Sequence, residues 1–77
     1  MKIEIYSKDG CASCVAAIQL AEDRNYDVTV KKLGVDFSRE ELLAEFPTAR
    51  TFPQIKAEGM ALGGFDEFHE FLKATPR

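Results

Sequence analysis

The sequence has few of the features that mark nucleic-acid binders, membrane proteins or secreted proteins. Its 77 residues include 10 Lys and Arg against 13 Asp and Glu, a formal net charge of −3, which supplies no basic face for nucleic acid. No apolar run approaches the roughly 20 residues that span a bilayer. Charged residues interrupt positions 1–6, where a signal peptide would need an apolar segment. These absences predict a soluble, cytoplasmic protein without a nucleic-acid or membrane partner.

The chain is also short. At 77 residues it lies near the lower size limit for a fold that is held together by a hydrophobic core alone. Hydrophobic residues make up 45% of the chain and charged residues 30%, which are ordinary globular proportions and argue against disorder. No linker, repeat or low-complexity tract divides the sequence. We therefore expect a single domain over residues 1–77.

Cysteine is scarce, with only Cys11 and Cys14, three positions apart. Small secreted folds that depend on disulfides normally carry four, six or eight cysteines, and a bridge between these two closes a loop too small to stabilise the fold much. A structural zinc site needs four ligands, and the only histidine, His69, is far along the chain. We expect no resident metal. Two interpretations remain: a dithiol that opens and closes, or a partial ligand set that another molecule completes.

Hydrophobic periodicity and turn residues predict seven elements in the order β-α-β-α-β-β-α. The first two strands flank a helix and must therefore run parallel, whereas the last two strands form an antiparallel hairpin. The expected fold is α/β, a mixed four-stranded sheet flanked by three helices. The predicted strands are 2–6, 28–33, 51–56 and 60–62, and the predicted helices are 11–24, 39–46 and 65–74.

The first predicted helix begins at or just before Cys11. Apolar residues recur there at intervals of three, with two more that widen the stripe toward the core. The members of this stripe are Val15, Ile18 and Ala21, with Ala17 and Leu20 beside them.

The second predicted helix carries a complete start signature. The Ser38 side chain can accept from the Glu41 amide while the Glu41 carboxylate reaches back to Ser38, and Phe37 can pack on Leu42. Pro47 ends this helix.

The position of Cys11 favours the thiolate, which is the nucleophile in thiol–disulfide exchange. Unpaired amides and the helix dipole stabilise an anion at a helix N-terminus, and Lys8 adds a positive charge three residues upstream. Cysteines in such positions have pKa values of roughly 3.5–7.5. Cys14 lies one turn further along the helix, where it can attack a mixed disulfide on Cys11, and we expect it to be less exposed. The pair is therefore predicted to contain an attacking and a resolving thiol.

Two further segments are candidate binding loops. A cis peptide bond between Phe52 and Pro53 would turn the backbone groups of Phe52 outward to pair with an extended peptide thiol, although trans is the commoner state of such a bond. Gly64 precedes the last helix, whose first amides, near Phe65 and Asp66, could bind a carboxylate. A simple helix start with an acidic first turn explains the same residues, so both interpretations stay open here.

Together these motifs resemble the glutaredoxins, the small glutathione-dependent branch of the thioredoxin superfamily. The matching stretches, in order over the whole chain, are residues 5–14, 50–55 and 63–66. The resemblance implies a thioredoxin-like fold with a cis proline, with Cys11 as the nucleophile and Cys14 as the resolving cysteine. It further implies glutathione contacts from the Phe52 backbone, from Phe65 and Asp66, and from Lys8 helped by Arg50. The implied glutathione site comprises Lys8, Arg50, Thr51, Phe52, Pro53, Gly64, Phe65 and Asp66.

The implied activity is a glutathione-dependent thiol–disulfide oxidoreductase that reduces protein disulfides and glutathione mixed disulfides as a monomer. Ala12 and Ser13 replace the proline and tyrosine that glutaredoxins often have between the cysteines, and the short chain suggests a minimal bacterial or phage version. Two alternatives stay open. One is a redoxin that thioredoxin reductase recharges and that serves ribonucleotide reductase, a common client of the family. The other is a carrier of an iron–sulfur cluster bridged between two chains.

Overall fold

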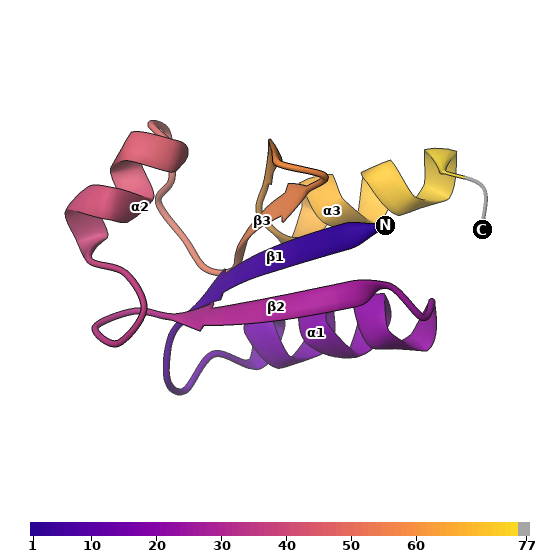
Figure 1. Cartoon of the computed structure of the whole chain (residues 1–77), viewed down its shortest axis with the longest axis horizontal. Helices are drawn as coiled ribbons and strands as arrows, with labels where there is room; N and C mark the ends of the chain where they lie inside the picture. Colours follow the sequence, from indigo (N-terminus) through magenta and orange to yellow (C-terminus); the bar gives the residue numbers. More distant parts are fainter. Residues whose placement is uncertain (76–77) are drawn as a thin grey trace.

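A computed structural model describes residues 1–75 of the chain. The β-α-β-α-β-β-α order predicted from the sequence is confirmed (Figure 1). The third strand begins later than predicted, at Gln54 instead of Thr51, because Pro53 has no N–H to contribute to a strand ladder. The elements are β1 (Lys2–Ser7), α1 (Ala12–Asp23), β2 (Asp27–Lys32), α2 (Arg39–Glu45), β3 (Gln54–Ala57), β4 (Met60–Gly63) and α3 (Phe65–Ala74).

The four strands form one mixed sheet in the order β2-β1-β3-β4. β1 runs parallel to β2, with Ile5 opposite Val30, and antiparallel to β3, with Ile5 opposite Ile55. β3 and β4 form the predicted antiparallel hairpin. Because β1 is central and leads directly into the loop before α1, the two cysteines lie at the end of a strand that is paired on both sides.

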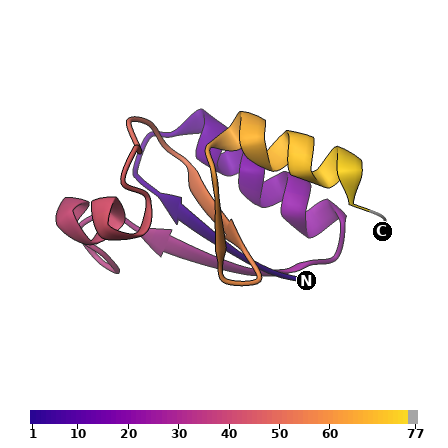
Figure 2. The ribbon, with the colours of Figure 1, turned by 90° about the horizontal axis from the view of Figure 1, so that it is seen from above.

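Helices α1 and α3 pack together on one face of the sheet (Figure 2). Inward-facing residues of the strands meet small residues of α1 and large residues of α3. The alanines of α1 allow its backbone to approach the sheet closely, and the Phe68 ring of α3 fills the space beside them without any exposed surface. The fully or nearly fully buried members of this core are Ile3, Ile5, Ala17, Ala21, Ile55, Ala57, Phe68 and Leu72.

A second, aromatic cluster anchors α2 at the end of the sheet toward which β1 points (Figure 1). The Tyr6 ring packs edge-on against Phe37, with ring centres 5.0 Å apart, and against Phe46 at 5.2 Å. The predicted capping box is present: Ser38 Oγ accepts from the Glu41 amide at 3.1 Å, and Glu41 Oε1 accepts from the Ser38 amide at 2.9 Å. Local capping and aromatic packing therefore fix the position of α2.

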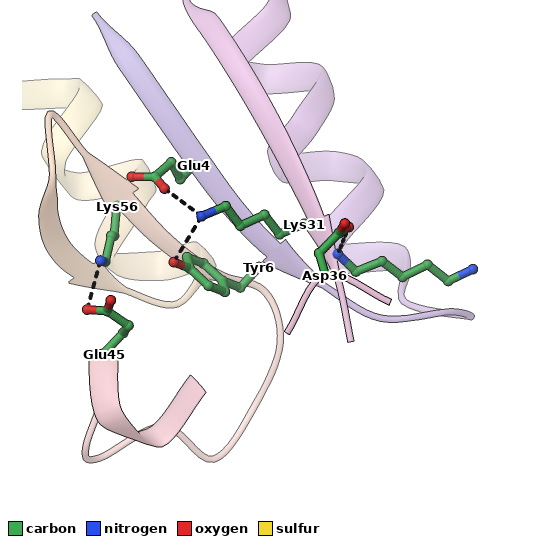
Figure 3. A network of polar contacts seen from close by, with 7 residues as sticks. Glu4, Tyr6, Lys31, Asp36, Glu45 and Lys56 are labelled. Carbon is green, nitrogen blue, oxygen red and sulfur yellow. Dashed lines mark hydrogen bonds and ion pairs between the residues drawn. The ribbon is translucent and has the colours of Figure 1, made fainter. Parts of the chain in front are cut away.

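The sheet face opposite α1 and α3 carries ion pairs (Figure 3). Lys31 Nζ lies 2.9 Å from Glu4 Oε1 and 3.5 Å from Tyr6 Oη, and the hydrogen bond with Glu4 raises the pKa of Lys31. Lys56 Nζ lies 2.8 Å from Glu45 Oε2, a contact that ties the last residue of α2 to β3.

The apolar stripe predicted for α1 is wrong at one position. Cys14, Ala17 and Ala21 are buried, whereas Val15 is 66% exposed. An α-helix turns by about 100° per residue, so the buried 14–17–21 face excludes Val15. The buried stripe begins one residue earlier than predicted, because Cys14 packs as an apolar residue. No helix within residues 1–75 combines the length and apolar character needed to cross a membrane.

Candidate active site

Cys11 and Cys14 form a disulfide at the start of α1, with their Cα atoms 5.2 Å apart. Cys11 is the N-cap of the helix, and its Sγ accepts a hydrogen bond from the backbone N–H of Cys14 at 3.1 Å. Cys11 is half-buried, whereas Cys14 is only 2% exposed. The predicted difference in exposure between the two cysteines is therefore confirmed.

The loop between β1 and α1 is held from both ends. Gly10 has a φ of +67°, a left-handed conformation that glycine adopts without steric cost, and it turns the chain into the helix. The Asp9 carboxylate pairs with Lys32 Nζ at 2.8 Å, and Ser7 Oγ donates to the Lys31 carbonyl at 3.0 Å. These contacts fix the loop that presents Cys11.

The loop before β3 contains the Phe52–Pro53 peptide bond in the cis form. The choice between cis and trans could not be made from the sequence. Pro53 is fully buried and Phe52 is half-buried. Gln54 Nε2 donates to the Thr51 carbonyl at 2.8 Å from a buried position and so holds this loop in place. Gln54 is not among the predicted site residues, although an amide side chain in a strand pattern, directly after a proline, signals such a role.

The start of α3 lies against this same loop. A Cβ atom on Gly64 would lie 3.6 Å from the Pro53 carbonyl oxygen and 3.9 Å from Thr51 Oγ1, which are ordinary van der Waals distances, so the two segments are in contact. The Glu67 carboxylate accepts from the Gly64 amide at 2.8 Å and completes a capping contact that the sequence analysis did not assign. Asp66 is exposed, and its carboxylate makes no hydrogen bond within residues 1–75.

Phe65 contacts both the core and a surface residue. It is half-buried and packs against the main core, and its outer side stacks on the exposed His69 ring, with ring centres 6.3 Å apart and planes 10° apart. Together with Ala16 of α1, these two residues line a surface groove between the helices. The start of α3 therefore lies beside α1, with the groove between them.

Cationic side chains lie beside Phe52. Lys8 Nζ lies 5.7 Å from the centre of the Phe52 ring, in a cation–π arrangement. Arg50, together with Arg39 at the start of α2, lines a small pocket of about 90 Å³ that also includes Phe52. Arg39 was missed because no local pattern connects residue 39 with residue 50; the chain reversal after α2 brings them together.

The predicted site residues therefore form two neighbouring groups. One consists of the disulfide. The other consists of the loop 51–53, the start of α3 from Gly64 to Asp66, and the cations beside Phe52, although the Phe65 ring faces the groove beside α1. Within residues 1–75, no group of three or more His, Cys, Asp or Glu side chains could hold a metal ion.

Comparisons with known proteins agree with this geometry. The sequence model of the glutaredoxin family matches residues 3–61, which is most of the chain. No curated protein sequence gives a significant match. Reduced glutaredoxin from Escherichia coli has 25% sequence identity and a TM-score of 0.83, with 97% of this chain and 96% of that chain covered.

Two further solved structures share the fold. The glutaredoxin-like NrdH-redoxin of Escherichia coli has 24% identity and a TM-score of 0.67, with 100% of this chain and 99% of that chain covered. A buckwheat glutaredoxin, solved as a complex with glutathione, has 20% identity and a TM-score of 0.70, with 94% of this chain and 68% of that chain covered.

A Cys-x-x-Cys disulfide at the first helix start, a thioredoxin-like β-α-β-α-β-β-α fold and the family match over residues 3–61 lead to one conclusion. The chain belongs to the glutaredoxin family of thiol–disulfide oxidoreductases, with Cys11 and Cys14 as its redox pair.

Proposed function

We propose that this protein reduces disulfides with electrons from glutathione, with Cys11 as the nucleophile and Cys14 as the resolving cysteine. The observation that carries the proposal is the hydrogen bond from the Cys14 backbone N–H to Cys11 Sγ at 3.1 Å. A backbone amide at a helix N-terminus stabilises a sulfur anion, and only the more exposed of the two sulfurs receives it. The buried sulfur of Cys14 is then suited to a second, intramolecular step.

The reaction proceeds through two exchanges. The Cys11 thiolate attacks one sulfur of a substrate disulfide, a Cys11–substrate disulfide forms, and the other substrate sulfur leaves as a thiolate that takes up a proton. The Cys14 thiolate then attacks the Cys11 sulfur, forms the Cys11–Cys14 disulfide and releases the second substrate thiolate. Two glutathione thiols reduce this disulfide and become one oxidised glutathione.

The charges around the second group of site residues fit the two ends of glutathione. The tripeptide has a glycyl carboxylate at one end and an ammonium and a carboxylate at its γ-glutamyl end. We assign the glycyl carboxylate to Lys8 and Arg50, which lie beside Phe52. We assign the γ-glutamyl end to Phe65 and Asp66. The Asp66 carboxylate makes no hydrogen bond within residues 1–75 and so can accept one from the ligand.

The centre of the tripeptide lies between these ends. The Phe52 backbone pairs with the cysteinyl unit, while Thr51, Pro53 and Gly64 shape the groove. Glutathione bound to the buckwheat glutaredoxin, which shares this fold, supports the assignment. Because glutathione is kept reduced in the cytosol, we place the protein there, acting as a monomer on disulfide-containing proteins.

A coupled assay tests the proposal. NADPH oxidation in the presence of glutathione and glutathione reductase is expected to depend on both glutathione and the protein. A protein that thioredoxin reductase recharges, and glutathione does not, would contradict the glutathione assignment. The fold shared with NrdH-redoxin makes this comparison a necessary control.

Single-cysteine variants separate the two sulfurs. Cys11→Ser is expected to abolish all activity, because it removes the attacking thiolate. Cys14→Ser is expected to keep the removal of glutathione from a glutathionylated peptide, since a second glutathione can release the product, and to lose the reduction of protein disulfides. A Cys14→Ser variant without activity on the glutathionylated peptide would refute the assigned roles.

A further inference from the structure

A cleft reaches the disulfide from the side of α1. It has a volume of about 520 Å³ and is lined by both cysteines, by Val15 and Ile18 of α1, and by the loop of residues 7–10; we call it the α1 cleft. Its size lies within the range of about 300–1,000 Å³ that is typical of ligand clefts. Of the residues assigned to glutathione, only Lys8 lines it, and the ammonium group of that residue lies over the Phe52 ring instead.

The α1 cleft exposes an aliphatic side chain, Val15, that takes no part in either core cluster, whereas Ile18 also packs against the main core. Val15 is 66% exposed and belongs to neither of the two core clusters, although it lies next to the resolving cysteine in the sequence. Ile18, one turn further along, is half-buried and continues the aliphatic surface. The loop of residues 7–10 also lines the cleft, and there the Asp9 carboxylate pairs with Lys32 at the surface. An apolar occupant would meet the aliphatic side chains of α1.

We propose that the α1 cleft binds an apolar side chain of the protein substrate, located next to the cysteine that reacts with Cys11. This inference rests on the proposed nucleophilic role of Cys11 and adds a protein-recognition site to it. The substrate sulfur must reach Cys11 Sγ, and Cys11 itself lines the cleft. Val15 lies one helical turn beyond Cys11, whose carbonyl accepts from the Val15 amide at 3.3 Å. Because an extended chain advances by about 3.3 Å per residue, side chains flanking the substrate cysteine come within reach of Val15.

The α1 cleft thereby distinguishes two kinds of substrate. Glutathione is assigned to the loop 51–53, Gly64 and the start of α3, which do not line the α1 cleft. A protein chain with a leucine or another aliphatic residue beside its cysteine gains the burial of that side chain against Val15. This burial should make the reduction of such a substrate about fivefold to tenfold faster than that of a substrate with a polar residue at the same place.

The test uses the fully reduced protein and three synthetic peptides, each with one intramolecular disulfide. Two peptides carry leucine on one or the other side of the first cysteine, and the third carries serine on both sides. Stopped-flow measurement of a single turnover gives the rate constant for each peptide without any glutathione. The result is therefore independent of whether glutathione recharges the protein, which the coupled assay decides separately.

The wild-type protein is expected to reduce one leucine peptide about fivefold to tenfold faster than the serine peptide. In Val15→Ser this ratio is expected to fall close to one. Val35→Ser is the matched control, because Val35 is 74% exposed and does not line the α1 cleft, and this variant should keep the wild-type ratio. Equal rates for all three peptides in the wild-type protein, or an unchanged ratio in Val15→Ser, would overturn the proposal. Circular dichroism of both variants verifies that they are folded.

Discussion

Ionisation of the Cys11 thiol is the property on which the proposed chemistry depends most directly. Replacing Cys14 by serine frees this thiol and leaves in place the backbone N–H that lies 3.1 Å from Cys11 Sγ. A hydrogen bond to a charged group contributes about 1.5–3 kcal/mol, and the helix N-terminus acts through the same unpaired amides. Since each 1.4 kcal/mol is a tenfold change in an equilibrium constant, this hydrogen bond raises the acid dissociation constant by about tenfold or more.

The assay is a pH titration of Cys14→Ser, followed by the ultraviolet absorbance of the thiolate and by the rate of alkylation. The expected result is a Cys11 pKa well below that of free cysteine. Ala12→Pro, made in the same background, is a useful control. Proline is tolerated at the first helical position, the extended conformation of Cys11 suits a residue before proline, and the Cys14 amide is retained. The titration should therefore change little. If Cys11 in Cys14→Ser ionised at the same pH as free cysteine, the reasoning from the helix N-terminus would be refuted.

Three further predictions concern the framework of the site. Ser38→Ala removes the capping contact with Glu41 and should lower the unfolding free energy by about 1 kcal/mol, measured by urea unfolding; an unchanged midpoint would contradict the role of the cap. Phe68→Ala should cost about 3–5 kcal/mol, against a total of about 4–12 kcal/mol for a chain of this length, so its circular dichroism should show extensive unfolding at moderate temperature. The hydrogen bond from Lys56 lowers the pKa of Glu45 from its ordinary value of 4.5. The ion pair therefore contributes to folding stability at pH values above 4.5, and this stabilisation is lost as the pH falls through the folded-state pKa of Glu45. Glu45→Gln should therefore destabilise the protein slightly at neutral pH and have no effect in acid, and an equal loss at both pH values would argue against the ion pair.

The exposed position of Val15 shows where a hydrophobic pattern is ambiguous. Apolar residues at intervals of three fit more than one face of a helix, and the buried face of α1 is chosen by contact with the sheet. Cys14 belongs to that buried face, so the residue with a chemical role also contributes to packing. The valine that follows it is left at the surface, beside the disulfide.

The sequence by itself determined the features that depend on neighbouring residues. The order of the seven elements, the capping box at Ser38 and the position of Cys11 at a helix start are all written in segments of a few residues. Backbone propensity, turn chemistry and capping act over such distances, and for this reason these predictions are confirmed.

Only the tertiary structure decided how these segments meet. The strand order β2-β1-β3-β4, the cis state of the Phe52–Pro53 bond, the approach of Gly64 to Pro53 and the position of Lys8 over Phe52 join residues far apart in the chain. Such contacts depend on how all elements pack at once, because each side chain's burial is set by every neighbour in the core. The position of the cysteine pair at a helix start is therefore predictable from ten consecutive residues, whereas the candidate binding surfaces around it form only in the folded chain.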